Sequence, residues 1–503
     1  MTGPAAGKVW LVGAGPGDPG LLTLKAARAI AACDVLVYDY LASSAIVALA
    51  PPDCEKIYVG KKAGAHTLSQ DEITALIVKL GREGRRVVRL KGGDVFVFAR
   101  GGEEAAELRA AGIPFEIIPG ITSAIAAPAY AGIPITHRDH NTSFTVATGH
   151  EDPTKGYSSL DFAKLANPKA TLVFLMAMGS LAGIVAKLRE HGMPGDLPVG
   201  IVREGTKPTQ ETLVGTLATI VDDVARTKFA APAIVVIGNV VRERETIRWF
   251  DTHPLFGKRV LVTRARGASD EFAEKLWEIG AEPVLAPAIA IGPPDDPAPA
   301  RDALAMLATR TWVVFTSANG VDACFDALSA AGGDARRFGP ARVAAIGPKT
   351  AERLMARGIR ADFIPSEYVA EAVAVGLLER TTPGDTILLY GAQEMRDILP
   401  DALRGEGRSV DVVAAYKTTH VRDEAIARAA ETTDVWTFTS ASTVASFLEN
   451  VPDASALQSS RLVACLGPVA ASAARAAGLR VDCVAASFTV DGLVEALAAP
   501  VGG

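Results

Sequence analysis

The hydrophobic positions of this sequence cluster in short apolar runs, most of which end in glycine or polar residues. Such runs are typical of strands that are buried in a sheet. Longer alanine-rich or amphipathic stretches, such as 21–32 and 105–111, predict helices. Strands that alternate with helices indicate an α/β fold. In the first half the predicted strands are 8–12, 34–38, 57–60, 86–90, 115–118, 143–148, 171–176, 198–202 and 233–237.

The pattern stops and restarts near the middle of the chain. Residues 242–251 are largely charged, and 253–257 contain proline and glycine, as linkers do. The strand–helix pattern then begins again with a strand at 259–264, a helix at 269–279 and a proline-rich crossing at 287–297. The predicted domains are therefore 1–252 and 258–503, with a linker at 253–257.

The second half contains an internal repeat. The segment 312–319 recurs at 436–442, and 342–348 recurs at 461–468, with offsets of 438 − 315 = 123 and 467 − 347 = 120. Each copy predicts a strand, a Thr-Ser turn, a helix, a strand and a Gly-Pro turn, so two similar α/β modules are expected. The hydroxyls of these turns are suited either to binding carboxylates in a cleft or to capping the next helix.

A glycine-rich stretch stands out in the first half. After the predicted strand 86–90 come Gly92, Gly93 and Asp94, where bare backbone allows a ligand to approach and the carboxylate can accept a hydroxyl or an amine. Gly101-Gly102 and the acids Glu103 and Glu104 follow, which predicts a turn and then a helix with acids in its first turn. A strand-to-helix loop without a ligand has the same pattern.

A second glycine-rich segment, 13–20, matches the Gly-x-Gly-x-x-Gly pattern of dinucleotide-binding proteins. Pro16 and Pro19 stiffen this loop and remove amides that would bind a pyrophosphate. A nicotinamide-dependent dehydrogenase fused to a flavodoxin-like domain is therefore the weaker alternative.

Polar side chains follow several predicted strands. Asp39, Lys61 and Asp94 each come at a strand's carboxyl end, where open α/β sheets bind ligands. They are suited to acid–base work, although a solvated ion pair would give the same pattern. Thr122 and Ser123 can cap a helix or bind a ligand.

Composition excludes several classes of protein. The formal net charge is −6 with no long basic run, which argues against a nucleic-acid surface. The five cysteines form no CxxC motif, so neither a zinc site nor a disulfide framework is expected, and a reducing cytoplasm fits. No signal peptide or membrane-spanning run is expected. His137 and His150 lack ligand spacing, so no metal site is expected.

Seven motifs occur in one order in the first half. They are Gly13-Ala14-Gly15-Pro16-Gly17-Asp18, Val37-Tyr38-Asp39, Val59-Gly60-Lys61, Leu90-Lys91-Gly92-Gly93-Asp94, Arg100-Gly101-Gly102-Glu103-Glu104, Pro119-Gly120-Ile121-Thr122 and Thr136-His137-Arg138-Asp139. Together they resemble the uroporphyrinogen-III C-methyltransferases of the tetrapyrrole methylase family. The family usually has proline where Val95 stands and alanine where Ser123 stands.

This resemblance implies S-adenosylmethionine as methyl donor, two α/β subdomains with the cofactor in the cleft, and a homodimer. It makes Asp39 the proton acceptor and Lys61 the proton donor. A methionine at position 176, at the end of an apolar strand, is by itself typical core filler, but the resemblance makes it a cofactor contact. The implied cofactor contacts are Pro16, Gly92, Gly93, Asp94, Val97, Thr122, Ser123, Met176 and Gly205.

The second half is similar to uroporphyrinogen-III synthases. The matching pieces are Val262-Thr263-Arg264, Phe315-Thr316-Ser317-Ala318-Asn319, 346–351, Tyr416 and Phe438-Thr439-Ser440. The resemblance implies two flavodoxin-like lobes, about 258–290 plus 420–503 and 291–419, joined by a two-stranded linker. Tyr416, expected near the end of a strand at 410–415, resembles the tyrosine suggested to assist departure of hydroxide. Val469 replaces the family's usual threonine.

Both resemblances predict a bifunctional tetrapyrrole enzyme. It would cyclise hydroxymethylbilane to uroporphyrinogen III and methylate that product twice to precorrin-2, on the sirohaem or cobalamin branch, without a metal. No dehydrogenase–ferrochelatase segment precedes Lys8, so we expect sirohaem to be completed elsewhere. The alternative is a methyltransferase fused to a non-catalytic, tetrapyrrole-binding regulatory module.

Overall fold

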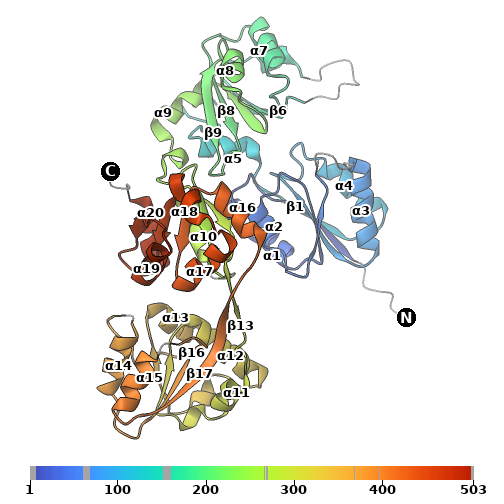
Figure 1. Cartoon of the computed structure of the whole chain (residues 1–503). Coiled ribbons are helices and arrows are strands. Elements are labelled where there is room, and N and C mark those ends of the chain that lie inside the picture. Colours follow the sequence, from blue (N-terminus) through green and yellow to red (C-terminus); the bar gives the residue numbers. More distant parts are fainter. Residues whose placement is uncertain are drawn as a thin grey trace. The chain divides into compact units, whose positions relative to one another are not determined.

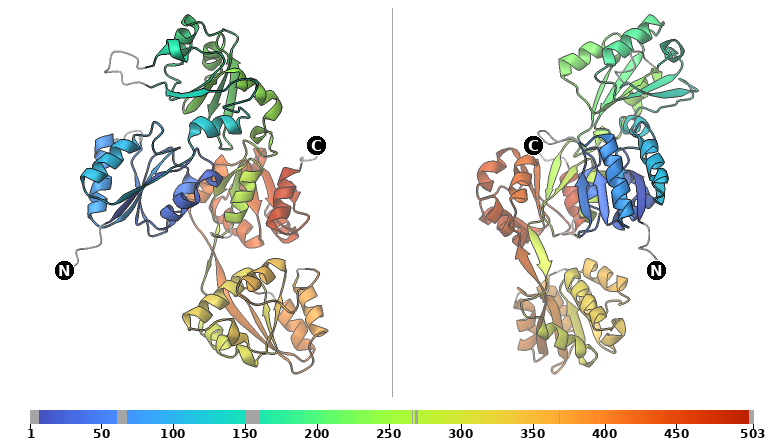
Figure 2. Two further views of the ribbon diagram at one scale, coloured as in Figure 1. Left: turned by 180° about the vertical axis from the view of Figure 1, so that it is seen from behind. Right: turned by 90° about the vertical axis from the view of Figure 1, so that its right-hand side faces the viewer.

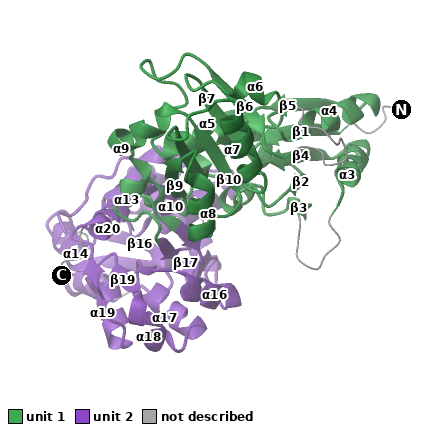
Figure 3. Cartoon of the chain, turned by 90° about the horizontal axis from the view of Figure 1, so that it is seen from above, with its two compact units in different colours: residues 1–258, 276–282 green, residues 259–275, 283–503 purple. Residues whose placement is uncertain are grey.

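The computed structural model describes residues 7–60, 68–150, 160–265, 267, 270–367, 369–395 and 397–499. Contacts divide the chain into two compact units, coloured separately in Figure 3. Unit 1 is Met1–Lys258 with Leu276–Glu282, and unit 2 is Arg259–Lys275 with Pro283–Gly503. The described residues form four five-stranded sheets flanked by helices (Figure 1), which confirms the predicted α/β class. The exact domain limits at 252 and 258 stay a prediction.

The first sheet of unit 1 is entirely parallel. Its strand order is β3-β2-β4-β1-β5. Its strands are β1 (Lys8–Gly13), β2 (Val35–Tyr38), β3 (Glu55–Tyr58), β4 (Arg86–Lys91) and β5 (Phe115–Ile118). Parallel strands need crossover connections, and helices on both faces bury the apolar side chains of the strands. Every strand therefore ends at the same edge, which we call the carboxyl edge.

Short capped helices connect these strands. They are η1 (Pro19–Leu21), α1 (Leu24–Ala31), α2 (Ser44–Val47), α3 (Gln70–Arg82), α4 (Gly101–Ala110) and α5 (Ser123–Tyr130). The prediction of a helix from 21 was wrong at its start, because Thr23 caps α1 by accepting a hydrogen bond from the Ala26 amide. Gly101 and Gly102 are the first residues of α4 rather than a turn, and the left-handed Arg100 precedes them.

The second sheet of unit 1 is mixed, with the order β6-β7-β10-β8-β9. Helix α5 packs on it, since Ala124 and Ala127 share a core with strand residues of β7, β8 and β10. The strands are β6 (Phe144–Thr148), β7 (Thr171–Leu175), β8 (Pro198–Arg203), β9 (Glu211–Thr216) and β10 (Ala233–Ile237). The helices are α6 (Phe162–Leu165), α7 (Leu181–Glu190), α8 (Ile220–Thr227), η3 (Asn239–Glu243), α9 (Arg244–Ile247) and η4 (Phe250–Thr252).

Unit 2 carries the other two sheets, ordered β12-β11-β18-β19-β20 and β13-β17-β16-β14-β15. Their strands are β11 (Arg259–Val262), β12 (Glu282–Leu285), β13 (Ile289–Gly292), β14 (Trp312–Phe315), β15 (Arg342–Ala345), β16 (Thr386–Ala392), β17 (Ser409–His420), β18 (Val435–Phe438), β19 (Leu462–Cys465) and β20 (Cys483–Val484). The proline-rich crossing predicted at 287–297 contains β13. Strand β13 lies antiparallel to the last residues of β17, as the two-stranded segment in Figure 2 shows.

The helices of unit 2 begin with α10 (Asp270–Glu278) and continue along both sheets. They are α11 (Ala298–Ala305), η5 (Leu307–Thr309), α12 (Ala318–Ala330), η6 (Ala335–Phe338), α13 (Pro348–Ala356), α14 (Ala370–Leu378), α15 (Ile398–Gly405), α16 (Glu424–Thr432), α17 (Ala441–Asn450), α18 (Ala454–Leu457), η7 (Gln458–Ser460), α19 (Pro468–Ala476) and α20 (Val490–Ala498). Among the described residues, none of these or the earlier helices is long and apolar enough to cross a membrane.

The internal repeat is visible in the local geometry of unit 2. Gly347 and Gly467, which precede α13 and α19, have the same backbone angles, φ −168° and ψ 178°. Ser317 and Ser440 cap α12 and α17 in the same way, each accepting a hydrogen bond from an amide of the first turn. The prediction of two similar modules is confirmed at this level.

Candidate functional site

Four glycines bring the first loops of the carboxyl edge into direct contact. Gly93 exchanges two backbone hydrogen bonds with Gly15, at 2.7 and 3.1 Å. A Cβ on Gly13 would lie 2.5 Å from the Gly120 amide nitrogen, and one on Gly120 would lie 2.3 Å from the Gly93 oxygen. The glycines are therefore required by the packing of one loop on another. The close approach that the sequence suggested for a ligand is made here by the chain itself.

Asp94 organises the loop after β4. Its Oδ1 accepts hydrogen bonds from the amides of Phe96 (2.8 Å) and Val97 (3.2 Å), and its Oδ2 accepts one from the Gly120 amide (3.1 Å). The carboxylate therefore joins the ends of β4 and β5. This differs from the sequence interpretation, in which the carboxylate was left free for a ligand.

Asp39 follows β2 at the same edge and has two partners. Its Oδ1 accepts from the Leu41 amide at 3.1 Å, and its Oδ2 accepts from Arg89 Nη2 at 3.3 Å. The Asp39 side chain is 22% exposed, whereas that of Arg89 is 3% exposed. The Asp39 carboxylate is thus held by the buried Arg89 guanidinium and remains accessible to solvent, which suits a base.

Arg89 belongs to a buried ionic cluster under this edge. Arg89 Nε (3.3 Å), Lys91 Nζ (2.9 Å) and Gln70 Nε2 (2.9 Å) all donate to Glu104 Oε1, and Glu104 is fully buried in the first turn of α4. Its Oε2 has no hydrogen-bond partner among the described residues. Burial, and then the charge of Arg89, lower the pKa of Lys91, while Glu104 opposes that shift. Removing Glu104, the anion hydrogen-bonded to both cations, would therefore be costly.

The sequence contains a signal for this cluster that is independent of the seven motifs. Arg89 and Lys91 are two positions apart on β4, so they point to the same face of the sheet. Two cations on one face of an otherwise apolar strand require buried anions. Glu104 was interpreted only as an acid that favours a helix N-terminus, and its role as the shared partner appears in the tertiary structure.

Helix α5 carries Thr122 and Ser123 to the glycine cluster. Thr122 is the N-cap residue, and its hydroxyl accepts from the Ala124 amide at 3.3 Å. A Cβ on Gly93, whose φ is +70°, would lie 3.7 Å from the Ser123 amide nitrogen, so a small cradle separates the two loops. Exposed apolar side chains follow the neighbouring strands. They are Tyr40, Leu41, Phe96, Phe98 and Ile121.

Met176 lies just after β7 and is 51% exposed, with φ 54°. The core-filler interpretation of this residue is therefore wrong, since its side chain faces solvent. Burial of the strand stops at Leu175, one residue earlier.

The loop after β8 packs against both α5 and the glycine loop after β1. A Cβ on Gly205 would lie 2.3 Å from Ala127 Cβ. The buried Thr206 accepts a hydrogen bond from the Asp18 amide at 3.1 Å through its hydroxyl, and Tyr130 donates to Asp18 at 2.7 Å. Pro16 is two residues from Asp18. Hence Pro16, Gly93, Thr122 and Gly205 come from segments that contact one another.

Lys61, the predicted proton donor, falls in 61–67, outside the described residues.

Tyr416 lies inside β17 rather than near a strand end, because that strand continues to His420, paired first with β16 and then with β13. The side chain is 8% exposed, and its hydroxyl oxygen lies 3.0 Å from Ser317 Oγ. Ser317 also caps α12, so the capping interpretation holds for the Thr-Ser turns. The pair joins a strand to a helix N-terminus within one lobe.

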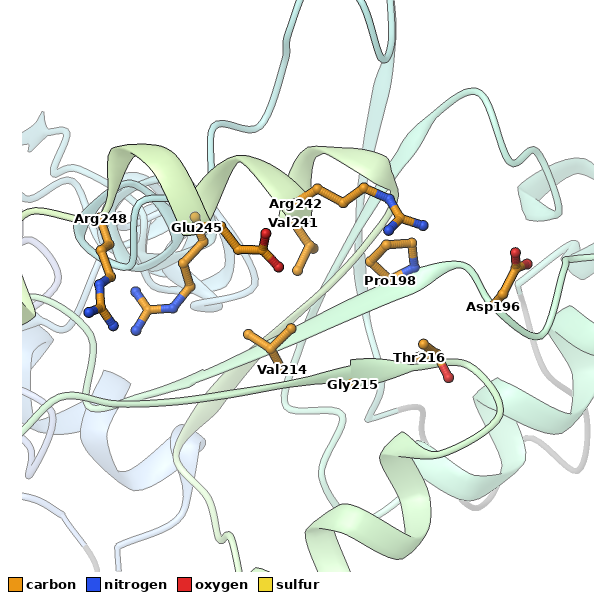
Figure 4. Close-up of a pocket in the computed structure, with 10 residues that line it drawn as sticks. Asp196, Pro198, Val214, Gly215, Thr216, Val241, Arg242, Glu245 and Arg248 are labelled. Carbon is orange, nitrogen blue, oxygen red and sulfur yellow. The ribbon is translucent and has the colours of Figure 1, made fainter.

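One cavity of unit 1 lies away from these residues. It measures about 580 Å³ and is bounded by β8, β9 and the segment from η3 to α9 (Figure 4). Arg242, Arg244 and Arg248 line it, but Arg244 is already bound to Asp251 and to the Ala131 carbonyl. None of the predicted site residues is part of its wall. Its size alone does not make it the active site.

Two sequence families match the chain. Residues 8–221 match the tetrapyrrole (corrin/porphyrin) methylases, and residues 270–495 match uroporphyrinogen-III synthase HemD. The porphyrin biosynthesis protein HemD of Ruminiclostridium josui is 38% identical over 501 residues, which cover 99% of each chain.

Two further relatives match only the first half. An S-adenosyl-L-methionine-dependent uroporphyrinogen III methyltransferase of Methanosarcina barkeri is 53% identical over 235 residues, 47% of this chain and 92% of that protein. The crystal structure of a uroporphyrin-III C-methyl transferase from Thermus thermophilus, complexed with S-adenyl homocysteine, shares 38% identity. It covers 47% of this chain and 99% of that chain, with a TM-score of 0.40.

Proposed function

Because this chain belongs to the family of porphyrin biosynthesis proteins that join a tetrapyrrole methylase to a uroporphyrinogen-III synthase, we propose that it performs two consecutive steps. The second half cyclises hydroxymethylbilane to uroporphyrinogen III. The first half methylates that product twice to precorrin-2. The observation that carries the proposal is that two families match the two halves of a chain that is similar to a porphyrin biosynthesis protein over 99% of its length.

S-adenosylmethionine is the methyl donor, and its sulfonium supplies the methyl group that a nucleophilic ring carbon accepts. The residues at the carboxyl edge fit such a group. Gly93 and Ser123, both half-buried, bound a small cradle, and the exposed Phe96 and Ile121 on the same two loops offer apolar surface. Holding both reactants at one edge makes the transfer effectively unimolecular, which supplies much of the rate.

Asp39 is proposed as the group that accepts the proton released when the methylated ring becomes neutral. The Leu41 amide and Arg89 orient its carboxylate, and its accessible side chain can meet a substrate at this edge. Lys61 is proposed as the proton donor. Pro16, Gly92, Asp94, Val97, Thr122, Met176 and Gly205 are proposed to line the cofactor site together with Gly93 and Ser123.

In the second half the protein mainly has to hold a linear bilane folded for ring closure, an entropic contribution. Tyr416 is proposed to assist departure of hydroxide, because a buried hydroxyl beside Ser317 can donate a hydrogen bond to a leaving oxygen. We further propose a cytoplasmic homodimer formed through the first half, with its product on the sirohaem or cobalamin branch.

The test is to supply the purified chain with hydroxymethylbilane, with and without S-adenosylmethionine, and to follow absorption spectra and isomer composition. Uroporphyrinogen III is expected without the donor, and precorrin-2 with it. Formation of only the uninverted type I isomer would contradict the synthase assignment. Formation of uroporphyrinogen III that stays unmethylated would contradict the methylase assignment.

A further inference from the structure

Two histidines and one glutamate from distant segments meet in the part of unit 1 that contains its second sheet, which we call the second subdomain. His137 and His140 precede β6, and Glu243 is the last residue of η3. His140 Nε2 lies 2.7 Å from Glu243 Oε1, and His137 Nε2 lies 3.9 Å from Glu243 Oε2. One ligand atom from each of the three side chains lies within 4.8 Å of the other two.

Local structure explains how the two imidazoles share one side of the chain. The amides of His140 and Asn141 both donate to the His137 carbonyl at 3.0 Å, which closes one turn of chain. Residues three apart in such a turn face the same way. The ring centroids of His137 and His140 are accordingly 4.9 Å apart. The sequence comparison of His137 with His150 missed this His-x-x-His spacing.

The turn is held rigidly by a buried side chain. Asn141 Oδ1 accepts from the His137 amide at 2.8 Å. Asn141 Nδ2 lies within 3.1 Å of three acceptors, the carbonyls of Ile135 and Ser143 and the hydroxyl of Thr171. This places the ligand-bearing turn against the first residue of β7, so its position does not depend on solvent-exposed contacts.

The glutamate is fixed by the core. Val240 and Val241, three and two residues before Glu243, are 0% and 2% exposed and pack in one core cluster with residues of β7, β8 and β10. Glu243 itself is 24% exposed, so its carboxylate lies at the boundary between core and solvent. A cation could reach it from outside without opening the fold.

We propose that His137, His140 and Glu243 bind one borderline divalent cation of the Zn²⁺ type, with water at the remaining position. Two imidazole nitrogens and one carboxylate oxygen are a preferred donor set for such ions. In a tetrahedral site with bonds of 2.0–2.2 Å, adjacent ligand atoms lie about 3.4 Å apart. Side-chain rotations that move the three ligand atoms by about an ångström bring them to that spacing.

Asp139 is placed to orient one ligand. Its Oδ2 lies 4.0 Å from His137 Nδ1, the ring nitrogen that does not face Glu243. Nδ1 now accepts a hydrogen bond from the Asp139 amide at 3.3 Å. When Nε2 binds a cation, Nδ1 carries the proton instead, so this amide contact is exchanged for a hydrogen bond that Nδ1 donates to the Asp139 carboxylate, as metal-bound histidines commonly do. The bound cation would link the segment before β6 to the segment after β10. That link should stabilise the second subdomain against unfolding.

The experiment uses the full chain after chelator treatment and dialysis. Zn²⁺ is titrated by calorimetry, and Co²⁺ by its visible absorption. We expect one ion per chain at micromolar affinity, a tetrahedral Co²⁺ spectrum without a thiolate charge-transfer band, and a higher thermal unfolding midpoint with Zn²⁺. His140→Ala should weaken binding by about 100-fold, and Asp139→Asn by about tenfold.

His420→Ala is the matched control. His420 Nδ1 lies 2.6 Å from Glu449 Oε1, a comparable histidine–glutamate pair in unit 2 outside any such three-residue cluster among the described residues. Its loss should leave the titration unchanged. Should His140→Ala unfold the chain, Glu243→Gln, which keeps a hydrogen-bond acceptor beside His140, serves instead. Equal affinity and stoichiometry in parent and Glu243→Gln, a thiolate spectrum, or no binding at all would overturn the proposal.

Discussion

The hydroxyl oxygen of Tyr416, in the middle of β17, lies 3.0 Å from the Oγ of Ser317, the N-cap residue of α12. Ser317 Oγ also accepts from the Gly320 amide at 3.1 Å, so the serine is fixed by the helix it caps. The pair therefore presents an oriented phenol at a helix N-terminus, where negative charge is favoured. A departing hydroxide is such a charge.

Tyr416→Phe should lower the rate of bilane cyclisation by about 100-fold, as expected for the loss of a positioned acid. Methylation of supplied uroporphyrinogen III should not change. The control is Tyr390→Phe, which removes the hydroxyl of another buried tyrosine of the same sheet. Enzymatic cyclisation is measured from the ratio of type III to type I uroporphyrinogen in the product. Equal ratios in Tyr416→Phe and parent would exclude a catalytic hydroxyl.

Asp39→Asn should reduce methyl transfer by about 100-fold, because an amide cannot accept the proton. Cofactor affinity should stay within about threefold, since the change affects the substrate side. Asp34→Asn is the matched control, because Asp34 precedes the same strand and binds Arg86 rather than Arg89. Single-turnover transfer of a labelled methyl group reports the step directly. A decrease in the methyl-transfer rate of less than fivefold would reject Asp39 as the base.

Glu104→Gln should destabilise unit 1 by about 3–5 kcal/mol, because two buried cations would lose their shared anion. Differential scanning calorimetry of the full chain measures the effect as a lower midpoint temperature of the first unfolding transition. Glu103→Gln removes only an exposed ion pair with Arg100, for which less than about 1 kcal/mol is expected. Equal transition temperatures for the two variants would show that the cluster contributes no stability.

Asp94→Ala should weaken S-adenosylmethionine binding by about 1.5–3 kcal/mol. The expected cause is indirect, since the carboxylate holds the Phe96, Val97 and Gly120 amides in place. Asp94→Asn, which retains one acceptor oxygen, should weaken binding less. Isothermal calorimetry gives both affinities. Unchanged affinity in Asp94→Ala would remove this loop from the cofactor site.

Glu116 should give the first sheet a measurable acid sensitivity. Its ion pairs, first with Lys25 and then with Lys8, hold the pKa of Glu116 at about 2, below the usual value of 4.5 for a glutamate. A carboxylate with a lowered folded-state pKa stabilises fully above the unfolded value, and that contribution is lost as the pH falls from 4.5 towards 2.

The measurement for Glu116 compares unfolding midpoints of the parent and Glu116→Gln across that pH window. The two should differ most above pH 4.5, by at most about 1 kcal/mol because both lysines are largely exposed. The difference should shrink steadily towards pH 2. Glu107→Gln, an exposed position on α4, should show no such trend. A difference that is constant with pH would contradict the assignment.

The sequence by itself determined the strands, the glycine turns and the repeat of the second half. These features depend on short-range properties, namely apolar periodicity and the backbone freedom of glycine, which are present in any short window. That information was sufficient to place Asp39 and Asp94 at strand ends. Because all strands of the first sheet are parallel, these ends form one edge.

Only the tertiary structure decided which polar groups became partners. Glu104 meets Arg89 and Lys91 because the crossover from β4 to α4 brings a helix N-terminus over the face that carries both cations. Cys33 and Cys54, 21 residues apart, come within 3.4 Å in the core beside β2. His140 meets Glu243 across 103 residues because η3 returns beside the turn that precedes β6. Pairing of this kind follows from strand order and packing, which no short stretch of sequence contains.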